Sequence, residues 1–217
     1  MIEAAVPALR PLLPRFIWTA AASASLFVAA VAAGAPLWFA GALALVPWLP
    51  VLGGLAATTW RSAGAWLTFY LIVAATQTGH VLEHVVQIAQ LRVLHVPGSH
   101  AHGIFGQLDI EWVHFAWNSW ILIAVVALLI GRPASRWLWL ALPLAAWHLL
   151  EHVVLIRTFM ATGLEGSPGL LAMGGLIGNG LPIARPELHL IYNLVETVPL
   201  LIGLAVAWRS IALGQRR

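Results

Sequence analysis

The sequence predicts an all-α, polytopic membrane protein with six transmembrane helices, of which the last four form a duplicated bundle with pseudo-twofold symmetry. Of its 217 residues, 61% are hydrophobic and only 9% are charged, whereas soluble domains carry about 25% charged residues. Several apolar stretches reach the roughly 20 residues that a helix needs to cross a bilayer. The pattern HVLEHVV at 80–86 recurs as HLLEHVV at 148–154, with six identical positions. Composition therefore indicates an integral membrane protein, and the repeat indicates a duplication within it.

Apolar stretches bounded by proline, glycine and arginine predict the helices one by one. They cover about 14–34, 37–58, 63–94, 109–131, 136–159 and 187–208. Only a tripeptide, GAP, joins the first two, which predicts a tight hairpin. Because residues 1–60 contain few polar side chains, we expect an N-terminal transmembrane hairpin that packs within the protein or contacts other membrane subunits. Residues 61–217 are expected to form the duplicated bundle.

The arginines predict the orientation of the chain in the membrane. All eleven basic residues are arginine, and they are scattered near predicted helix ends, so no nucleic-acid partner is expected. With a cytoplasmic N-terminus, three of them face outward: Arg92, Arg157 and Arg185. The other eight then face the cytoplasm: Arg10, Arg15, Arg61, Arg132, Arg136, Arg209, Arg216 and Arg217. Because cytoplasmic segments are enriched in basic residues, we expect both termini in the cytoplasm and a multi-pass location in a bacterial-type inner (plasma) membrane.

The duplication extends beyond the seven-residue motif. After the first copy come GIFGQ and EWVHFAWN, and after the second come GLIGN and ELHLIYN. This alignment pairs His114 with His189 and Asn118 with Asn193. Each repeat then consists of two helices, at about 63–131 and 136–208, and both copies enter the membrane in the same direction. A pseudo-twofold axis along the membrane normal is the expected relation between them.

The polar residues of the four repeated helices are expected to converge in the outer half of the membrane. At about 100° per residue, the two histidines and the glutamate of each motif share one helix face. The polar residues that begin the fourth and sixth helices also share a face, and the predicted orientation places all of them at the same depth. The predicted metal ligands are His80, Glu83, His84, Glu111, His114, His148, Glu151, His152, His189, Asn193 and Glu196.

These residue types point to a metal site. A glutamate inside a bilayer costs roughly 2.5 kcal/mol or more unless it is paired, hydrated or neutralised. Imidazole and carboxylate groups are ligands of zinc, iron, manganese and copper. We expect a bimetallic site with one three-histidine cluster in each repeat, and with Glu83 and Glu151 bridging the ions or orienting the ligands. The second repeat has Pro186 where the first has Glu111, so the two half-sites are expected to differ. The absence of cysteine excludes iron–sulfur ligation, thiolate zinc sites and haem attached through C-x-x-C-H.

We interpret the chain as an integral membrane non-haem metalloprotein that holds two transition-metal ions, iron or copper in preference to zinc. It would act as an oxidoreductase or monooxygenase on a small or lipophilic substrate, with Glu83 and Glu151 as the candidate catalytic residues. Three alternatives stay open. Facing histidines can ligate a b-type haem in a quinone-linked electron carrier, and a zinc-dependent membrane hydrolase would use either glutamate as the base. A cluster without metal would relay protons or ions, or serve packing alone.

The outer loops carry further polar residues. His95, His100 and His102 either bind metal ions at an accessory site or are solvated. Asp109 is expected to cap the helix that follows it. The second outer segment, 162–186, is rich in glycine and apolar residues, and we expect it to lie over the site as a lid.

Overall fold

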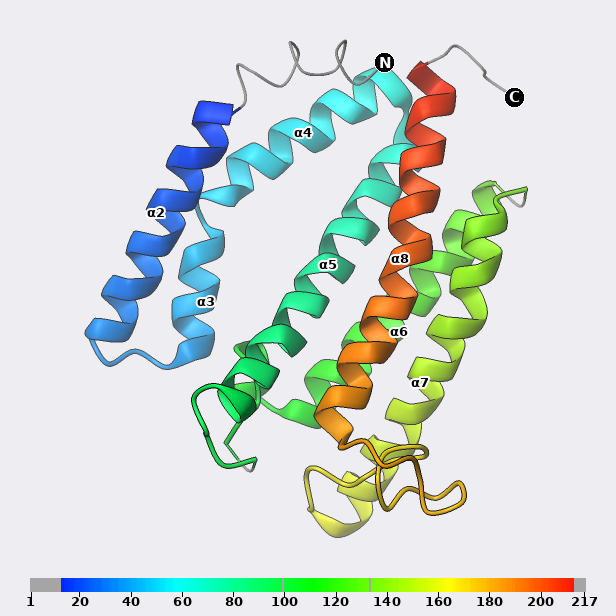
Figure 1. Ribbon diagram of the computed structural model, residues 1–217. Helices are drawn as coiled ribbons and strands as arrows, with labels where there is room; N and C mark the ends of the chain where they lie inside the picture. The colour runs from blue at the N-terminus through cyan, green and yellow to red at the C-terminus, as the bar shows by residue number, and fades with distance from the viewer. Residues whose placement is uncertain (1–12, 99, 133, 213–217) are drawn as a thin grey trace. The chain divides into compact units, whose positions relative to one another are not determined.

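The computed structural model describes residues 13–98, 100–132 and 134–212, which form helices and no strand (Figure 1). The elements are α2 (Leu13–Ala32), α3 (Leu37–Leu45), α4 (Trp48–Ala63), α5 (Ala65–Arg92), the short 3-10 helix η1 (Phe105–Gln107), α6 (Ile110–Gly131), α7 (Arg136–Thr162) and α8 (Arg185–Ala212). Arg10, Arg216 and Arg217, which contribute to the predicted orientation, lie outside the described residues. Contacts divide the chain into two compact units, the first ending at Thr58 and the second beginning at Thr59.

The first unit contains α2, α3 and most of α4. The side chain of Ser23 on α2 donates a hydrogen bond to the carbonyl of Ala44 on α3, at 2.6 Å. The prediction of one continuous helix over 37–58 is wrong, because α3 and α4 are separate and meet at an angle of 46°. Pro47 lies at the break. Proline has no N–H to donate, and its ring clashes with the carbonyl four residues earlier, so a bend at this place is expected physically.

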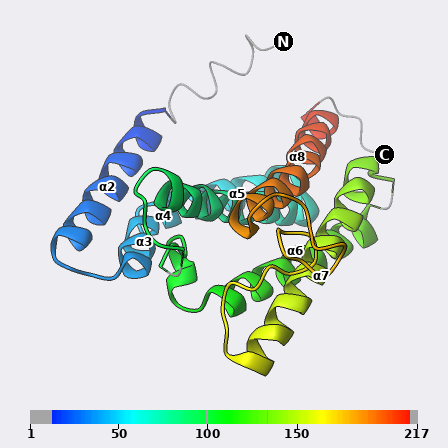
Figure 2. The ribbon, with the colours of Figure 1, turned by 60° about the horizontal axis from the view of Figure 1, so that its bottom comes forward.

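The second unit is a bundle of α5, α6, α7 and α8. Helix α5 packs against α8, α6 against α7, and the remaining neighbours α5–α6 and α7–α8 are also in contact, so each helix touches two others in a closed ring. The closest packing joins helices that the duplication assigns to different repeats. The α5–α6 and α7–α8 loops lie at the same end of the bundle, and the short α6–α7 link lies at the other end (Figure 1). Figure 2 brings the loop end forward and shows the long α7–α8 segment across it.

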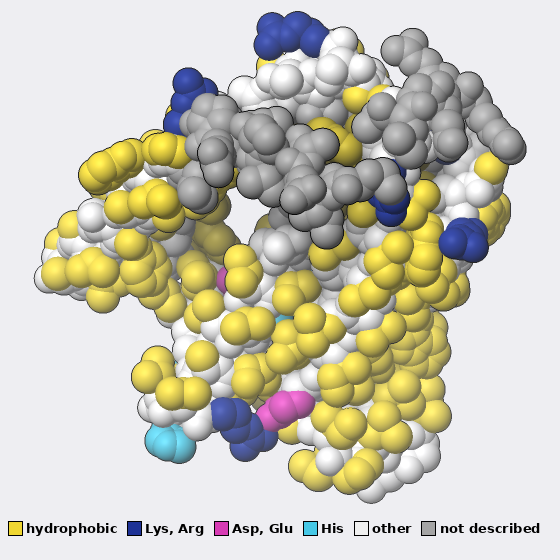
Figure 3. Space-filling view, turned by 45° about the horizontal axis from the view of Figure 1, so that its top comes forward, with side chains coloured by type: hydrophobic (Ala, Val, Ile, Leu, Met, Phe, Trp, Pro, Cys, Tyr) yellow, Lys and Arg dark blue, Asp and Glu magenta, His cyan; other side chains and the backbone are white. Residues whose placement is uncertain are grey.

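Several helices have the length and composition of membrane spans. Four of them, α2, α6, α7 and α8, qualify individually, and the bent α3–α4 pair qualifies as a possible fifth span. Helix α5 does not qualify by hydropathy, because it carries three glutamines, two histidines and a glutamate in 28 residues. Those polar side chains are buried, whereas Ile72, Leu82 and Val85 are exposed on its outer face. Figure 3 shows apolar side chains covering the visible flanks of the helices.

The interior of the bundle is divided into an apolar half and a polar half. The apolar half lies toward the α6–α7 link, and its fully buried side chains include Tyr70, Val73, Ile121, Leu128 and Leu200. The polar half lies toward the loops and contains all six histidines of the predicted site. This apolar packing separates the polar half from the opposite end of the bundle, so the site is approached from the loop end.

Candidate metal centre

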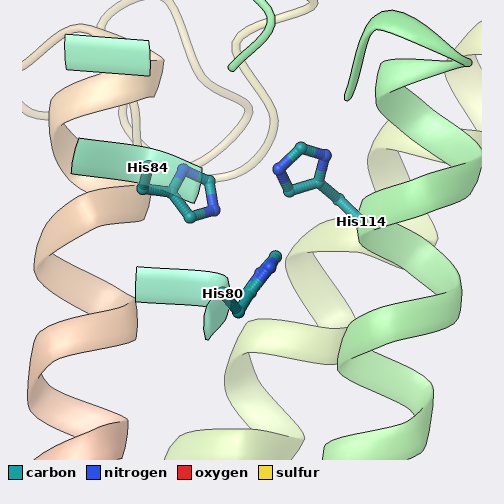
Figure 4. Close-up of side chains that lie close together, drawn as sticks. All are labelled: His80, His84 and His114. Carbon is teal, nitrogen blue, oxygen red and sulfur yellow. The ribbon is translucent and has the colours of Figure 1, made fainter. Parts of the chain in front are cut away.

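The six histidines form two clusters of three. The first combines His80 and His84 of α5 with His114 of α6, and Figure 4 shows their three rings turned toward a common centre. The second combines the corresponding residues of α7 and α8: His148, His152 and His189. Within each cluster, one nitrogen from every ring lies within 4.8 Å of the others. Two imidazole nitrogens bound to one ion are at most about 4.2 Å apart, so small side-chain shifts would complete either site.

The two clusters are adjacent. The ring centroids of His114 and His152 are 5.8 Å apart and nearly parallel. Those of His84 and His189 are 6.1 Å apart. These separations between clusters are only slightly larger than the 4.8 Å between His80 and His84 within one cluster. Ions held by the two clusters would therefore be close neighbours in one dinuclear centre.

The Nδ1 atoms of four of these rings are engaged by oxygen acceptors. His114 donates to the carbonyl of Ile110 at 2.6 Å, and His189 donates to the carbonyl of Arg185 at 2.9 Å. His148 donates to the carboxylate of Glu196 at 2.9 Å. His84 donates to the side-chain oxygen of Gln87 at 3.3 Å.

These hydrogen bonds leave the Nε2 atom of each of the four rings without a partner among the described residues. Because each acceptor requires the proton on Nδ1, the Nε2 atom of the same ring carries a free lone pair. All six Nε2 atoms are buried and have no hydrogen-bond partner among the described residues. An unsatisfied buried polar atom costs about 1–3 kcal/mol. Each cluster of three such rings could hold a metal ion, and in four of the six rings an orienting contact engages the opposite nitrogen.

The two motif glutamates bind the backbone of the loops. Oε1 of Glu83 accepts the N–H groups of Ile104, Phe105 and Gly106, at 2.7, 2.8 and 3.0 Å. Oε1 of Glu151 accepts the N–H of Leu170 at 2.9 Å. These two residues are the predicted catalytic groups and are also among the predicted ligands. In this structure each engages the loop that follows its own helix.

The other two buried glutamates are bound to side chains. Glu111 forms a bidentate ion pair with Arg185, with both N···O distances at 2.7 Å, and also accepts the N–H of Gly166. Glu196 accepts the Nδ1 proton of His148 through Oε2, while its Oε1 has no partner within the described part of the chain. Both carboxylates adjoin the histidine clusters through these contacts, Glu196 directly and Glu111 through its place one turn from His114.

The paired asparagines hold the backbone of the histidine helices. The side chain of Asn118 donates to the carbonyl of His114, and that of Asn193 donates to the carbonyl of His189, each at 2.9 Å. The oxygen of Asn193 accepts a further hydrogen bond from Gln77 at 3.1 Å. The predicted ligand Asn193 thus has both ends of its amide engaged by protein groups.

A cavity of about 540 Å³ reaches the histidines from the loop end. Histidines of both clusters line it: His84, His114, His152 and His189. Its remaining wall is largely apolar and comes from both loops and the first turns of α6 and α8, with Ile110, Pro168, Met173 and Pro186 among the lining residues. His102 also lines the cavity, with Nε2 3.9 Å from the carboxylate of Glu165. His95 and His100 are exposed and line no part of it.

Several residues at the centre have no predicted role. Gln87 orients His84, and Gln90 binds both the N–H and the carbonyl of Gly103. Arg185 neutralises Glu111 and accepts the proton of His189 through its carbonyl. The polar character of Gln87 and Gln90 at helical spacing from the motif is a signal that the sequence does contain. The partner of Arg185 lies on another helix, so spacing along the chain could not identify it.

The alignment of GIFGQ with GLIGN does not describe the loop contacts. The segment that meets Glu83 is Gly103–Gly106, within GIFGQ. The segment that meets Glu151 is Gly169–Ala172, GLLA, which precedes GLIGN. The structurally corresponding pattern is therefore a glycine, two apolar residues and a small residue. The second loop has additional residues after this pattern, which displaced the alignment.

Comparison of the chain with models of protein families, with curated proteins and with solved structures finds no match.

Proposed function

We propose that this chain is a membrane-embedded, non-haem metalloprotein whose two three-histidine clusters hold a pair of copper ions that carry out redox chemistry. The observation that carries the proposal is the set of six buried, unpartnered Nε2 atoms, four of them fixed by an acceptor on the opposite side of the ring. Packing alone does not account for this arrangement, because it leaves at least one nitrogen of every ring without a partner in the interior of the described bundle.

The ligand set favours copper over iron. Paired-iron sites in helical bundles use carboxylates as bridging ligands. Here both oxygens of Glu111 are bound to Arg185, and one oxygen of each other buried glutamate is engaged by protein donors. In the described part of the chain, imidazole nitrogens are then the most numerous free donors, beside one free oxygen each of Glu151 and Glu196. Imidazole suits copper, and copper also binds nitrogen sites most tightly among the common divalent ions.

Two ions at this distance suit an oxidoreductase or monooxygenase. Copper ions held by the two clusters would supply two-electron redox chemistry, one electron from each ion. Three histidines leave room on each ion for an external ligand. The cavity opens onto both clusters and is lined mainly by apolar side chains, which supports a small or lipophilic substrate.

Zinc is the second candidate, because three histidines and an open position also form a hydrolytic zinc site. A b-type haem is less well supported by the geometry. A porphyrin needs a wide flat slot between two axial histidines, whereas ring centroids of the two clusters approach to 5.8 Å and four further histidines surround that space. The geometry therefore favours a pair of metal ions over a haem.

The duplicated bundle and the topology belong to the same proposal. Helices α5 to α8 would cross the membrane with the repeats related by a pseudo-twofold axis, which the matching contacts α5–α8 and α6–α7 support. Six crossings require that α2 spans and that the bent α3–α4 pair counts as one span. The termini and the α6–α7 link would lie in the cytoplasm of a bacterial-type cell. The first unit would serve packing or contact with other membrane subunits.

Metal analysis of the purified chain, together with its absorption and electron paramagnetic resonance spectra, tests the proposal. We expect about two copper ions per chain, because there are two histidine clusters. Reduced protein should be colourless, and oxidised protein should show copper absorption. Zinc alone would move the function to hydrolysis, a Soret band would establish haem, and a metal-free chain after expression with copper and zinc would contradict the proposal.

A further inference from the structure

The motif glutamates meet the two outer loops in the same way. Glu83 and Glu151 are at corresponding positions of H-x-x-E-H, and each receives N–H groups from a turn that begins with glycine. Gly103 has a φ of +79° and Gly169 a φ of +71°. A Cβ atom added to either glycine would collide with Oε1 of the glutamate that its loop covers. Both loops therefore need glycine here for conformation and for close approach.

Further contacts connect the first loop to a histidine. Gln90 binds both backbone groups of Gly103, at 2.8 and 2.9 Å. Gln87 donates to the carbonyl of Ala101 at 2.9 Å, and its oxygen accepts the proton of His84. One side chain thus touches both the loop and a ring of the metal centre, so the loop position and the ring orientation are coupled.

The second loop is also connected to a histidine, through a different set of contacts. The carbonyls of Gly169, Leu170 and Leu171 accept hydrogen bonds from N–H groups later in the same loop. The segment that meets Glu151 is therefore the centre about which the rest of this loop is folded. Arg185 ties the end of the loop to Glu111 and, through its carbonyl, to the ring of His189.

We infer that Glu83 and Glu151 are positioning residues, each of which seats the loop of its own repeat over the metal pair and is not itself a metal ligand. The inference rests on the proposed function only in the statement that the loops cover a pair of metal ions. An ionised carboxylate that accepts backbone N–H groups is a strong acceptor, because charge-assisted hydrogen bonds are about twice as strong as neutral ones. Both loops contribute to the wall of the cavity, so seating them would limit access to the ions.

The first test measures the position of the loops without using metal. The chain contains no cysteine, and Ala101 and Ala172 are buried at 2% and 0% exposure in the two loops. Ala101→Cys and Ala172→Cys each introduce one thiol whose rate of alkylation by a hydrophilic maleimide reports local opening. We expect Glu83→Gln to accelerate labelling at position 101 about tenfold or more and to leave position 172 unchanged, and Glu151→Gln to do the reverse.

Glycine variants approach the same contact from the loop side. Gly169→Ala should accelerate labelling at position 172 as Glu151→Gln does, because the new methyl group displaces the carboxylate. Gly178→Ala is the matched control: it has a similar φ of +60° in the same loop, but its Cβ meets no atom within 4 Å. It should leave labelling near the rate of the parent chain.

Metal content supplies the second readout. The positioning role predicts that Glu83→Gln and Glu151→Gln still bind about two ions per chain, but release them faster to a hydrophilic chelator. Loss of one ion in either variant without faster labelling would show that the glutamate is a ligand and overturn the inference. Equal acceleration at both positions by one variant would indicate general loosening and would also overturn it. A parent chain without metal would defeat the proposed function, while the labelling comparison would still decide the role of the two glutamates.

Discussion

At the scale of single residues, the centre depends on which nitrogen of each imidazole is engaged by the protein. Backbone carbonyls one helical turn earlier receive the Nδ1 protons of His114 and His189. A carboxylate and an amide serve the same purpose for His148 and His84. His152 differs, because neither of its ring nitrogens has a partner among the described residues. The two clusters therefore have the same histidines but differ in the groups that orient them.

Removing one histidine from a cluster should remove one ion. His84→Ala and His152→Ala each leave two imidazoles in their cluster, too few to hold the ion with the required geometry. We expect metal content to fall from about two to about one per chain, measured by elemental analysis. The exposed His100 provides the control, since His100→Ala should leave the content unchanged. Equal metal content in all three variants would contradict the assignment of ligands.

Glu196 should affect the centre through His148. Glu196→Gln removes the anion that receives the Nδ1 proton at 2.9 Å and lets the ring adopt the other tautomer. Loss of such an orienting group typically lowers metal affinity roughly 10–100-fold, which competition with a chelator can measure. Glu187→Gln is the control, because Glu187 lies on the same helix and pairs with the exposed Arg92. An equal loss of affinity in both variants would show that the effect does not depend on His148.

At the scale of helices, the bundle is assembled by contacts between the two repeats. Asp109 caps α6 by accepting the N–H groups of Glu111 and Trp112. This cap begins α6 at the position where Glu111 can meet Arg185, the first residue of α8. Farther along these helices, apolar residues such as Ile121 and Leu200 are fully buried in the bundle. Local signals therefore determine where each helix begins, and the long-range ion pair aligns two of these beginnings.

Breaking that ion pair on one side should destabilise the bundle more than removing it altogether. Arg185→Met leaves Glu111, whose side chain is 1% exposed, without its countercharge. Removing one partner of a buried pair costs about 3–5 kcal/mol, whereas an apolar or neutral replacement of both is often tolerated. We expect the thermal midpoint in detergent to fall in Arg185→Met and to recover largely in Arg185→Met with Glu111→Gln. A double variant less stable than the single one would contradict this account.

At the scale of the whole molecule, the polar half of the bundle opens at the loop end and is closed by apolar packing at the other. In the proposed function, substrate would reach the histidine clusters through this opening. The proposed orientation places that route on the outer face of the membrane, with the α6–α7 link in the cytoplasm. Access from outside is therefore a consequence of topology, and topology can be measured separately.

Labelling of single thiols in intact cells tests this orientation. Leu176→Cys introduces a thiol at a loop residue that is 75% exposed, and Ala134→Cys introduces one in the α6–α7 link. A membrane-impermeant maleimide should label the first in intact cells and the second only after permeabilisation, because the arginine bias places the link inside. The reverse pattern would place the metal centre in the cytoplasmic half of the membrane.

The convergence of the six histidines was predictable from the chain alone. The repeat identified His80, His84 and His114 with their counterparts, and helical periodicity placed them on common faces. The positions of most helices followed from apolar length, because hydropathy and helix geometry are local properties. The bend at Pro47 was missed because the apolar composition on both sides is continuous.

The roles of the glutamates were decided only by the tertiary structure. Sequence shows that Glu83 and Glu151 are ionisable residues among apolar neighbours, and either metal ligation or pairing would satisfy them. Their partners are backbone N–H groups of distant loops, and every residue except proline carries such a group, so no sequence pattern marks it. Arg185 and Glu111 are likewise 74 residues apart and meet through packing. The sequence therefore determined the features that depend on side-chain type and helical spacing. The features that depend on where a loop packs against the bundle were decided only by the tertiary structure.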